Sequence, residues 1–259
     1  MSKLSKEDKF LDLSDYGRSA GSLLAKSLQN TRFTPIHLTL LFGLSGLISV
    51  YFIFSHQYIL AAVFLILKSI IDASDGELAR LKNKPSYTGR YLDSVFDIIL
   101  NAILIFAICF VSKTPYYIGF IAFFLLQLQG TLYNYYYVIL RTISVGGDGT
   151  SKIFEYKTPK ALVGEKQSHV NFLFQVYLIL YGLFDKIIHL MDSKAYQSKN
   201  FPNWFMTFVS VFGLGFQLLV MALLLTLNHI ELILPYFLVT SIFIVVIIGI
   251  RRTSLNCDL

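Results

Sequence analysis

Four aspartates stand close together in the chain at spacings that suit metal-assisted chemistry on phosphate groups. Asp72 and Asp75 are three residues apart and Asp93 and Asp97 are four apart, so each pair shares one face of a helix. Carboxylate oxygens select hard divalent cations such as Mg²⁺, Mn²⁺ or Ca²⁺. Two such ions held by carboxylates suit phosphoryl or phosphodiester transfer. The four aspartates therefore predict a metal site that acts on a phosphate.

The segment between the two pairs brings them together. Pro85 lies in the connector 81–88 and stops the first helix from continuing. A connector this short makes the two helices antiparallel neighbours, so all four carboxylates meet at one depth. Four like charges in partly apolar surroundings are costly to bury, and a bound cation offsets that cost.

Small and polar residues flank the aspartates. Gly76 and Ala79 continue the face of Asp72, and Gly89 precedes Asp93 by four. Missing side chains there leave either a groove for a ligand or room for close helix packing. Three cations and one amide are further candidates. Lys68 could form a structural ion pair or touch a phosphate, Arg80 could hold a phosphate or pair with Glu77, and Arg90 and Asn101 could contact the phosphate or the acceptor.

The composition places this site in a membrane. The 259 residues are 55% hydrophobic and only 15% charged, whereas a soluble domain carries about 25% charged residues. Six apolar runs are long enough to span a bilayer: 35–54, 58–78, 91–112, 116–140, 204–227 and 231–250. The predicted fold is an all-α, polytopic bundle of six transmembrane helices with interfacial amphipathic helices. The positive excess, a net charge of +6, is first a signal of how the chain is oriented in the membrane. Nucleic acid is not expected as a partner.

Basic residues divide the chain into four parts. Lys and Arg gather before the first run, after the second and fourth, and after the sixth, which predicts that both termini and the aspartates are cytoplasmic. The expected parts are a cytoplasmic segment 1–33 with an interfacial helix, catalytic transmembrane helices in 34–141, a cytoplasmic loop with an interfacial helix in 142–203, and two transmembrane helices with a tail in 204–259. Residues 1–13 lack the apolar core of a signal peptide.

Several segments have two interpretations. Ser168 to Leu190 carries a polar stripe and is expected to lie in the interface or against the bundle, with a seventh span as the alternative. The glycines of the polar loop 142–167 could wrap a phosphate, but a plain connector is favoured. Polar residues in the fourth run could form an acceptor pocket, although bonds between helices are favoured; they are Gln127, Gln129, Thr131 and Asn134. Pro35, His37 and Thr39 open the first run near the expected site.

The spacing of these residues resembles the signature of the CDP-alcohol phosphotransferases, Asp-x2-Asp-Gly-x2-Ala-Arg-x8-Gly-x3-Asp-x3-Asp. Every fixed position is matched between Asp72 and Asp97. The resemblance implies transfer of a substituted phosphate, such as phosphatidyl, from a CDP-alcohol to an acceptor alcohol with release of CMP, and often a homodimer.

The resemblance also implies a role for each matched residue. Asp72, Asp75 and Asp93 would bind Mg²⁺ or Mn²⁺, and Asp97 would be the general base and lie beside the metal. Gly76, Ala79, Arg80 and Gly89 would border the nucleotide. An integral, multi-pass protein of the plasma (inner) membrane is expected.

Two other functions compete with this one. Membrane prenyltransferases also bind diphosphates through paired Asp-rich motifs, but those motifs lie far apart in sequence. A cation transporter would place its carboxylates near the bilayer midplane, between broken helices, and not at the ends of spans.

Overall fold

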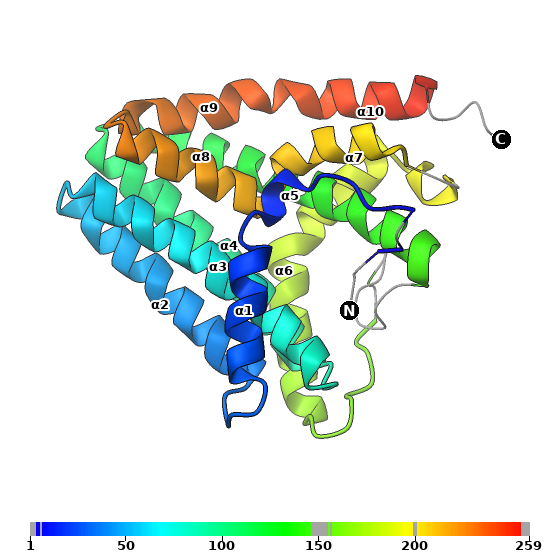
Figure 1. Ribbon diagram of the computed structural model, residues 1–259. Coiled ribbons are helices and arrows are strands. Elements are labelled where there is room, and N and C mark those ends of the chain that lie inside the picture. Colours follow the sequence, from blue (N-terminus) through cyan, green and yellow to red (C-terminus); the bar gives the residue numbers. More distant parts are fainter. Residues whose placement is uncertain (1–3, 6, 147–154, 156, 199–200, 255–259) are drawn as a thin grey trace.

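The computed structural model describes residues 4–5, 7–146, 155, 157–198 and 201–254, and these fold into helices without strands (Figure 1). The predicted all-α class is confirmed. The α-helices are α1 (Arg18–Leu28), α2 (Pro35–Phe54), α3 (Tyr58–Leu81), α4 (Tyr87–Val111), α5 (Tyr116–Val145), α6 (Gln167–Met191), α7 (Asn203–Val209), α8 (Leu214–Thr226), α9 (Ile233–Thr240) and α10 (Ile242–Ser254).

Length and composition suit a polytopic membrane protein. Five stretches among the described residues can cross a bilayer: α2, α4, Tyr116–Ser144 of α5, α6, and Ile230–Thr253 across α9 and α10. A bent pair, α7 with α8, makes a sixth if it forms one span. The second predicted run, 58–78, lies in α3, which is not among these stretches. Helix α3 has 24 residues, but it carries Lys68, Asp72 and Asp75 in its second half.

The fifth predicted run, 204–227, is not one straight helix. Asn203–Phe212 and Leu214–Thr226 meet at an angle of 54°, with Gly213 in extended conformation between them. The N-terminal 3₁₀ turn Leu13–Asp15 lies against this bend, where the Leu13 amide donates to Ser210 Oγ at 3.0 Å. Glycine is required here, because a Cβ on Gly215 would lie 1.8 Å from the Ser14 carbonyl oxygen. The sequence patterns did not suggest this contact.

The predicted amphipathic helix before the first span is α1, and it packs closely on α3. A Cβ on Gly21 would lie 3.0 Å from the Ile70 carbonyl oxygen, so glycine permits the contact. Leu23, on another face of α1, is 69% exposed. An exposed leucine next to the bundle fits the expected position at a lipid boundary.

Helix α6 contacts one end of the bundle at both of its own ends. Near its start, Phe174 packs edge-on against Tyr91, in the first turns of α4. Just beyond its end, the Asp192 carboxylate accepts from Tyr136 Oη of α5 at 2.7 Å. The first turns of α4 and the last turns of α5 lie on the same side, because these two helices are antiparallel neighbours. These contacts fit a helix packed across that end, although α6 is also long enough to span.

Asp192 also fixes the end of α10. Arg251 is 1% exposed and donates through Nε to Asp192 Oδ2 at 2.6 Å. We expected Arg251 to be a cytoplasmic flanking charge, and the structure shows a buried ion pair instead. Such a pair adds little net stability but strongly penalises loss of one partner.

We predict that Gly215→Ala destabilises the protein by about 1–3 kcal/mol, because the new methyl group overlaps the backbone of Ser14. Thermal unfolding in detergent measures the effect. Gly249→Ala is the matched control, since a Cβ there meets nothing within 4 Å. A Gly215→Ala protein as stable as the control would show that the N-terminal turn does not pack at the bend.

Candidate active site

The turn between α3 and α4 aligns the two aspartate pairs. Helix α3 ends at Leu81, Asn83 takes a left-handed backbone with φ of 50°, and Pro85 lies just before the next helix. Ser86 then caps α4 by accepting the Gly89 amide at 2.8 Å. The expected antiparallel arrangement is present, and it sets Asp72 and Asp75 beside Asp93.

Three of the four aspartates form a compact cluster. Asp72, Asp75 and Asp93 each offer a carboxylate oxygen, and these atoms all lie within 4.8 Å of one another. Asp75 is 9% exposed and accepts a hydrogen bond from Thr39 Oγ1 of α2 at 2.9 Å. Asp93 Oδ1 is buried and has no hydrogen-bond partner among the described residues. A buried carboxylate oxygen without a donor, beside two more carboxylates, is the donor set that a hard divalent cation needs.

Asp97 lies one helical turn beyond this group and has a different partner. Lys68 Nζ is 2.7 Å from Asp97 Oδ1 and 3.9 Å from Asp72 Oδ2. The Lys68 side chain is fully buried and lies 4.8 Å from the centre of the Phe42 ring. Of the two roles considered for Lys68, the geometry favours the structural ion pair. Its charge offsets part of the negative charge of the cluster.

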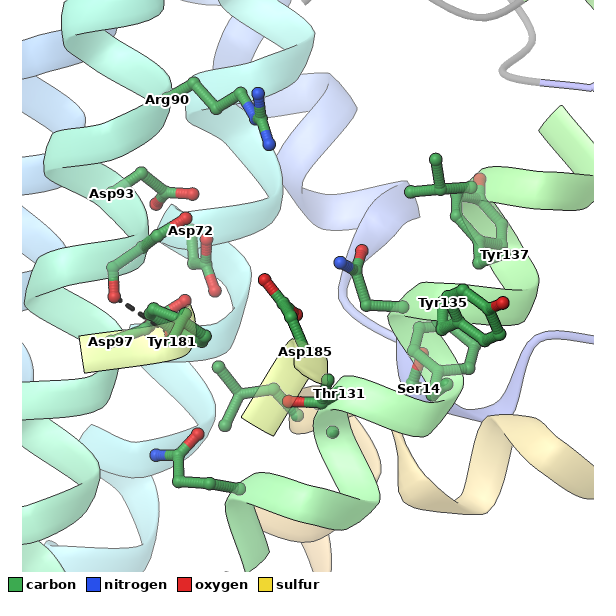
Figure 2. A pocket seen from close by; sticks show the side chains of 18 of the residues that line it. Ser14, Asp72, Arg90, Asp93, Asp97, Thr131, Tyr135, Tyr137, Tyr181 and Asp185 are labelled. Carbon is green, nitrogen blue, oxygen red and sulfur yellow. Dashed lines mark hydrogen bonds between the residues drawn. The ribbon is translucent and has the colours of Figure 1, made fainter. Parts of the chain in front are cut away.

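The cluster forms one wall of a cavity of about 840 Å³ (Figure 2). Four elements supply most of its lining: α3, α4, α5 and α6, with the N-terminal turn at one side. Among the residues expected at the nucleotide, Gly76 and Arg80 line the cavity, whereas Ala79 and Gly89 do not. A Cβ on Gly76 would meet only the Arg80 guanidinium, at 3.6 Å, so the glycine surface is open to a ligand.

Both arginines beside the aspartates are held by glutamates. Arg80 donates to Glu77 Oε2 through Nη2 at 2.7 Å and through Nε at 3.2 Å. Arg90 lies 2.5 Å from Glu155, which also accepts from Tyr91 Oη at 2.9 Å. Both arginines line the cavity, so each can meet a phosphate while its glutamate fixes its direction.

Glu165 attaches the loop before α6 to the start of α4. Its carboxylate accepts from Ser86 Oγ at 2.8 Å and from the Thr88 amide at 2.7 Å. Burial raises the pKa of Glu165, but hydrogen bonds from Thr88 and Ser86 outweigh burial and hold the pKa below its ordinary value. A carboxylate at a helix N-terminus also interacts favourably with the helix dipole. We expected a plain connector in 142–167; its glycine-rich part, 147–151, lies outside the described residues.

The polar residues of α5 were expected either to bond to other helices or to line a pocket, and they fall into two groups. Gln129 Nε2 donates to Ser241 Oγ at 2.8 Å and to the Phe237 carbonyl at 3.2 Å, so this residue joins helices. Gln127, Thr131 and Asn134 instead line the cavity, as does Asn101 of α4. Sequence reasoning did not find Glu155, Glu165 or the cavity roles of Tyr181 and Asp185.

A cavity with a cluster of carboxylates, within a bundle of apolar helices, fits the class of membrane protein that the sequence predicts, in which bound cations act on a phosphate. The sequence profile of the CDP-alcohol phosphatidyltransferases matches residues 32–237, and the chain belongs to this family. The chain is also 35% identical over 85 residues to the archaetidylinositol phosphate synthase of Pyrococcus horikoshii. That match covers 33% of this chain and 45% of the relative, less than half of its length.

We predict that Glu165→Gln lowers stability at pH 7 by roughly 0.5–1 kcal/mol, because the helix terminus loses its carboxylate. Since the pKa is lowered in the folded protein, this stabilisation is present above the ordinary pKa of 4.5 and is lost as the pH falls through the folded value. Thermal midpoints of both proteins should differ at pH 7 and converge below pH 4.5. A difference that stays constant over this range would rule out the carboxylate charge as its source.

We predict that Lys68→Met and Asp97→Asn each destabilise the protein. Lys68→Met should cost about 2–3 kcal/mol, because it removes the cation from the Asp97 carboxylate, whose side chain is only 15% exposed. The double variant should recover much of the stability lost in Lys68→Met but none of the turnover. Thermal unfolding and CMP release, measured on all three, separate the structural effect of the pair from the chemistry of Asp97. Additive stability losses would show that the two side chains do not interact.

Proposed function

We propose that the protein transfers a substituted phosphate, of the phosphatidyl type, from a CDP-alcohol to an acceptor alcohol, with divalent metal ions and release of CMP. One observation carries this proposal: Asp72, Asp75 and Asp93 offer oxygens within 4.8 Å of one another on the wall of a cavity of about 840 Å³. The family match supports the donor and the acceptor as substrate classes.

The three clustered aspartates would hold Mg²⁺ or Mn²⁺, with two ions expected and Asp97 adjacent. When bound, such ions neutralise the diphosphate and polarise the phosphorus that is attacked. Thr39 holds the Asp75 carboxylate in place through its hydroxyl. The unpartnered oxygen of Asp93 is the atom best placed to gain a cation.

Asp97 would act as the general base. The acceptor hydroxyl loses its proton to the Asp97 carboxylate, its oxygen bonds to phosphorus, and the bond from phosphorus to the CMP oxygen breaks. Lys68 contacts Oδ1, so Oδ2 is the natural proton acceptor. The buried lysine fixes the direction of the carboxylate, which general-base catalysis requires.

The donor would lie over Gly76, where the backbone is open, with Arg80 and Arg90 beside its phosphates. Ala79 and Gly89 do not line the cavity of the described residues, so a contact with the nucleotide would require a shift of the surrounding side chains. Glu77 and Glu155 orient the two arginines.

We further propose that the site and both termini face the cytoplasm of the plasma (inner) membrane, with α6 packed across the end of the bundle that carries the aspartates. The basic residues around the turn between α3 and α4 support this orientation. A homodimer is part of the proposal on the family resemblance alone. The family match disfavours the prenyltransferase and transporter alternatives.

We predict that membranes containing the protein release CMP from a CDP-alcohol only when Mg²⁺ or Mn²⁺ is present. EDTA should stop the reaction and added Mn²⁺ should restore it, because the carboxylate cluster loses and regains its cations. Mass spectrometry of CMP measures turnover, and membranes without the protein are the control. Full turnover after chelation would overturn the metal site.

A further inference from the structure

One end of the cavity has a wall of buried polar atoms that the protein leaves unbonded. Asn101 lies one turn beyond Asp97 on α4, and Gln127 and Thr131 share a face of α5. All three line the cavity and are only 2%, 4% and 6% exposed. Asn101 Oδ1, Gln127 Nε2 and Thr131 Oγ1 have no hydrogen-bond partner among the described residues.

Such atoms are uncommon inside proteins, because a buried polar atom without a partner has lost its hydrogen bonds to water and gained none in return. Three of them at one cavity wall indicate a ligand that supplies the missing bonds. The neighbouring Gln129 shows the contrast, since its amide donates to α9 and it does not line the cavity.

The opposite wall adds a carboxylate. Figure 2 shows Asp185 of α6 pointing into the space between Thr131 and the aspartate cluster. Tyr177 Oη donates a long hydrogen bond to Asp185 Oδ2, at 3.4 Å. Together the two walls offer a carbonyl acceptor, an amide donor, a hydroxyl and a carboxylate.

We propose that this end of the cavity binds the acceptor alcohol, and that the acceptor is a water-soluble compound with several hydroxyl groups, of the inositol or glycerol type. A hydroxyl both donates and accepts, so a polyol can satisfy all four protein groups at once. The proposal rests on the proposed function and deepens it, because it names the chemical class of the acceptor and the residues that bind it.

A lipid acceptor fits this wall poorly. Diacylglycerol has one free hydroxyl, and its chains would lie against amide and hydroxyl groups that stay unpaired. A site built to bond hydroxyls discriminates strongly against a compound that lacks them. The polyol also lies beside Asp97, the proposed base, since Asn101 is the next cavity residue along α4.

The test uses the full chain in lipid nanodiscs with Mn²⁺. The lipid donors are CDP-diacylglycerol and CDP-archaeol, each offered with myo-inositol, myo-inositol 1-phosphate, glycerol 3-phosphate or L-serine. The reverse arrangement offers CDP-choline with diacylglycerol. We expect CMP release from a lipid donor with an inositol or glycerol compound, and none from the reverse arrangement. Preference for L-serine, or turnover with diacylglycerol as acceptor, would overturn the proposal.

Variants then locate the subsite. Thr131→Val and Asn101→Leu keep the side-chain size but remove a polar atom, and each should raise KM for the polyol roughly tenfold while KM for the lipid donor changes less than twofold. Gln129→Met is the matched control on α5, and it should leave both KM values unchanged. A rise in donor KM, or an unchanged acceptor KM in both variants, would refute the subsite. Absence of CMP release from every pair with the unaltered chain would instead refute the proposed function.

Discussion

The main physical constraint on this structure is the mutual repulsion of carboxylates that the fold holds close together in partly apolar surroundings. Asp72, Asp75 and Asp93 come within 4.8 Å of one another, and Asp97 lies one turn away. One lysine is buried with them and contacts Asp97 and Asp72, so the protein neutralises only part of this charge itself. The remaining charge makes the cluster unfavourable without cations and attractive to them.

Close helix packing is what keeps the repelling groups in place. Glycine lets α1 approach α3 at Gly21, and glycine at Gly213 and Gly215 admits the N-terminal turn into the bend between α7 and α8. Glu165 and Glu155 attach the segment before α6 to the first turns of α4. The bundle therefore closes around a polar cavity from segments that are distant in sequence.

The aspartate cluster could largely be predicted from local sequence, whereas the contacts that close the rest of the cavity could not. The spacing of the aspartates and Pro85 were enough to predict two adjacent antiparallel helices and the convergence of their carboxylates. The choice of partner for Lys68 was not predictable, because Asp72 and Asp97 were both within reach and only the packing favours Asp97. Glu155 and Glu165 lie more than sixty residues from the groups that they bind, and no periodic pattern signals such contacts. The bend at Gly213 was missed because an apolar run looks the same whether straight or broken.

Helix α6 shows why a polar stripe alone does not locate a helix. We expected this helix to lie in the membrane interface or against the bundle, with a seventh span as the alternative. In the structure the early part of the stripe, Asn171 and Gln175, is exposed, whereas Gly182, Asp185, Lys186 and His189 line the cavity. A polar stripe toward bulk water and a polar stripe toward an internal cavity have the same period of 3.6 residues. The two kinds of stripe differ in what faces them. Here the stripe faces the aspartate cluster and the cavity wall with the unpartnered polar atoms of α4 and α5. The second half of the α6 stripe is thus explained by the cavity that it lines.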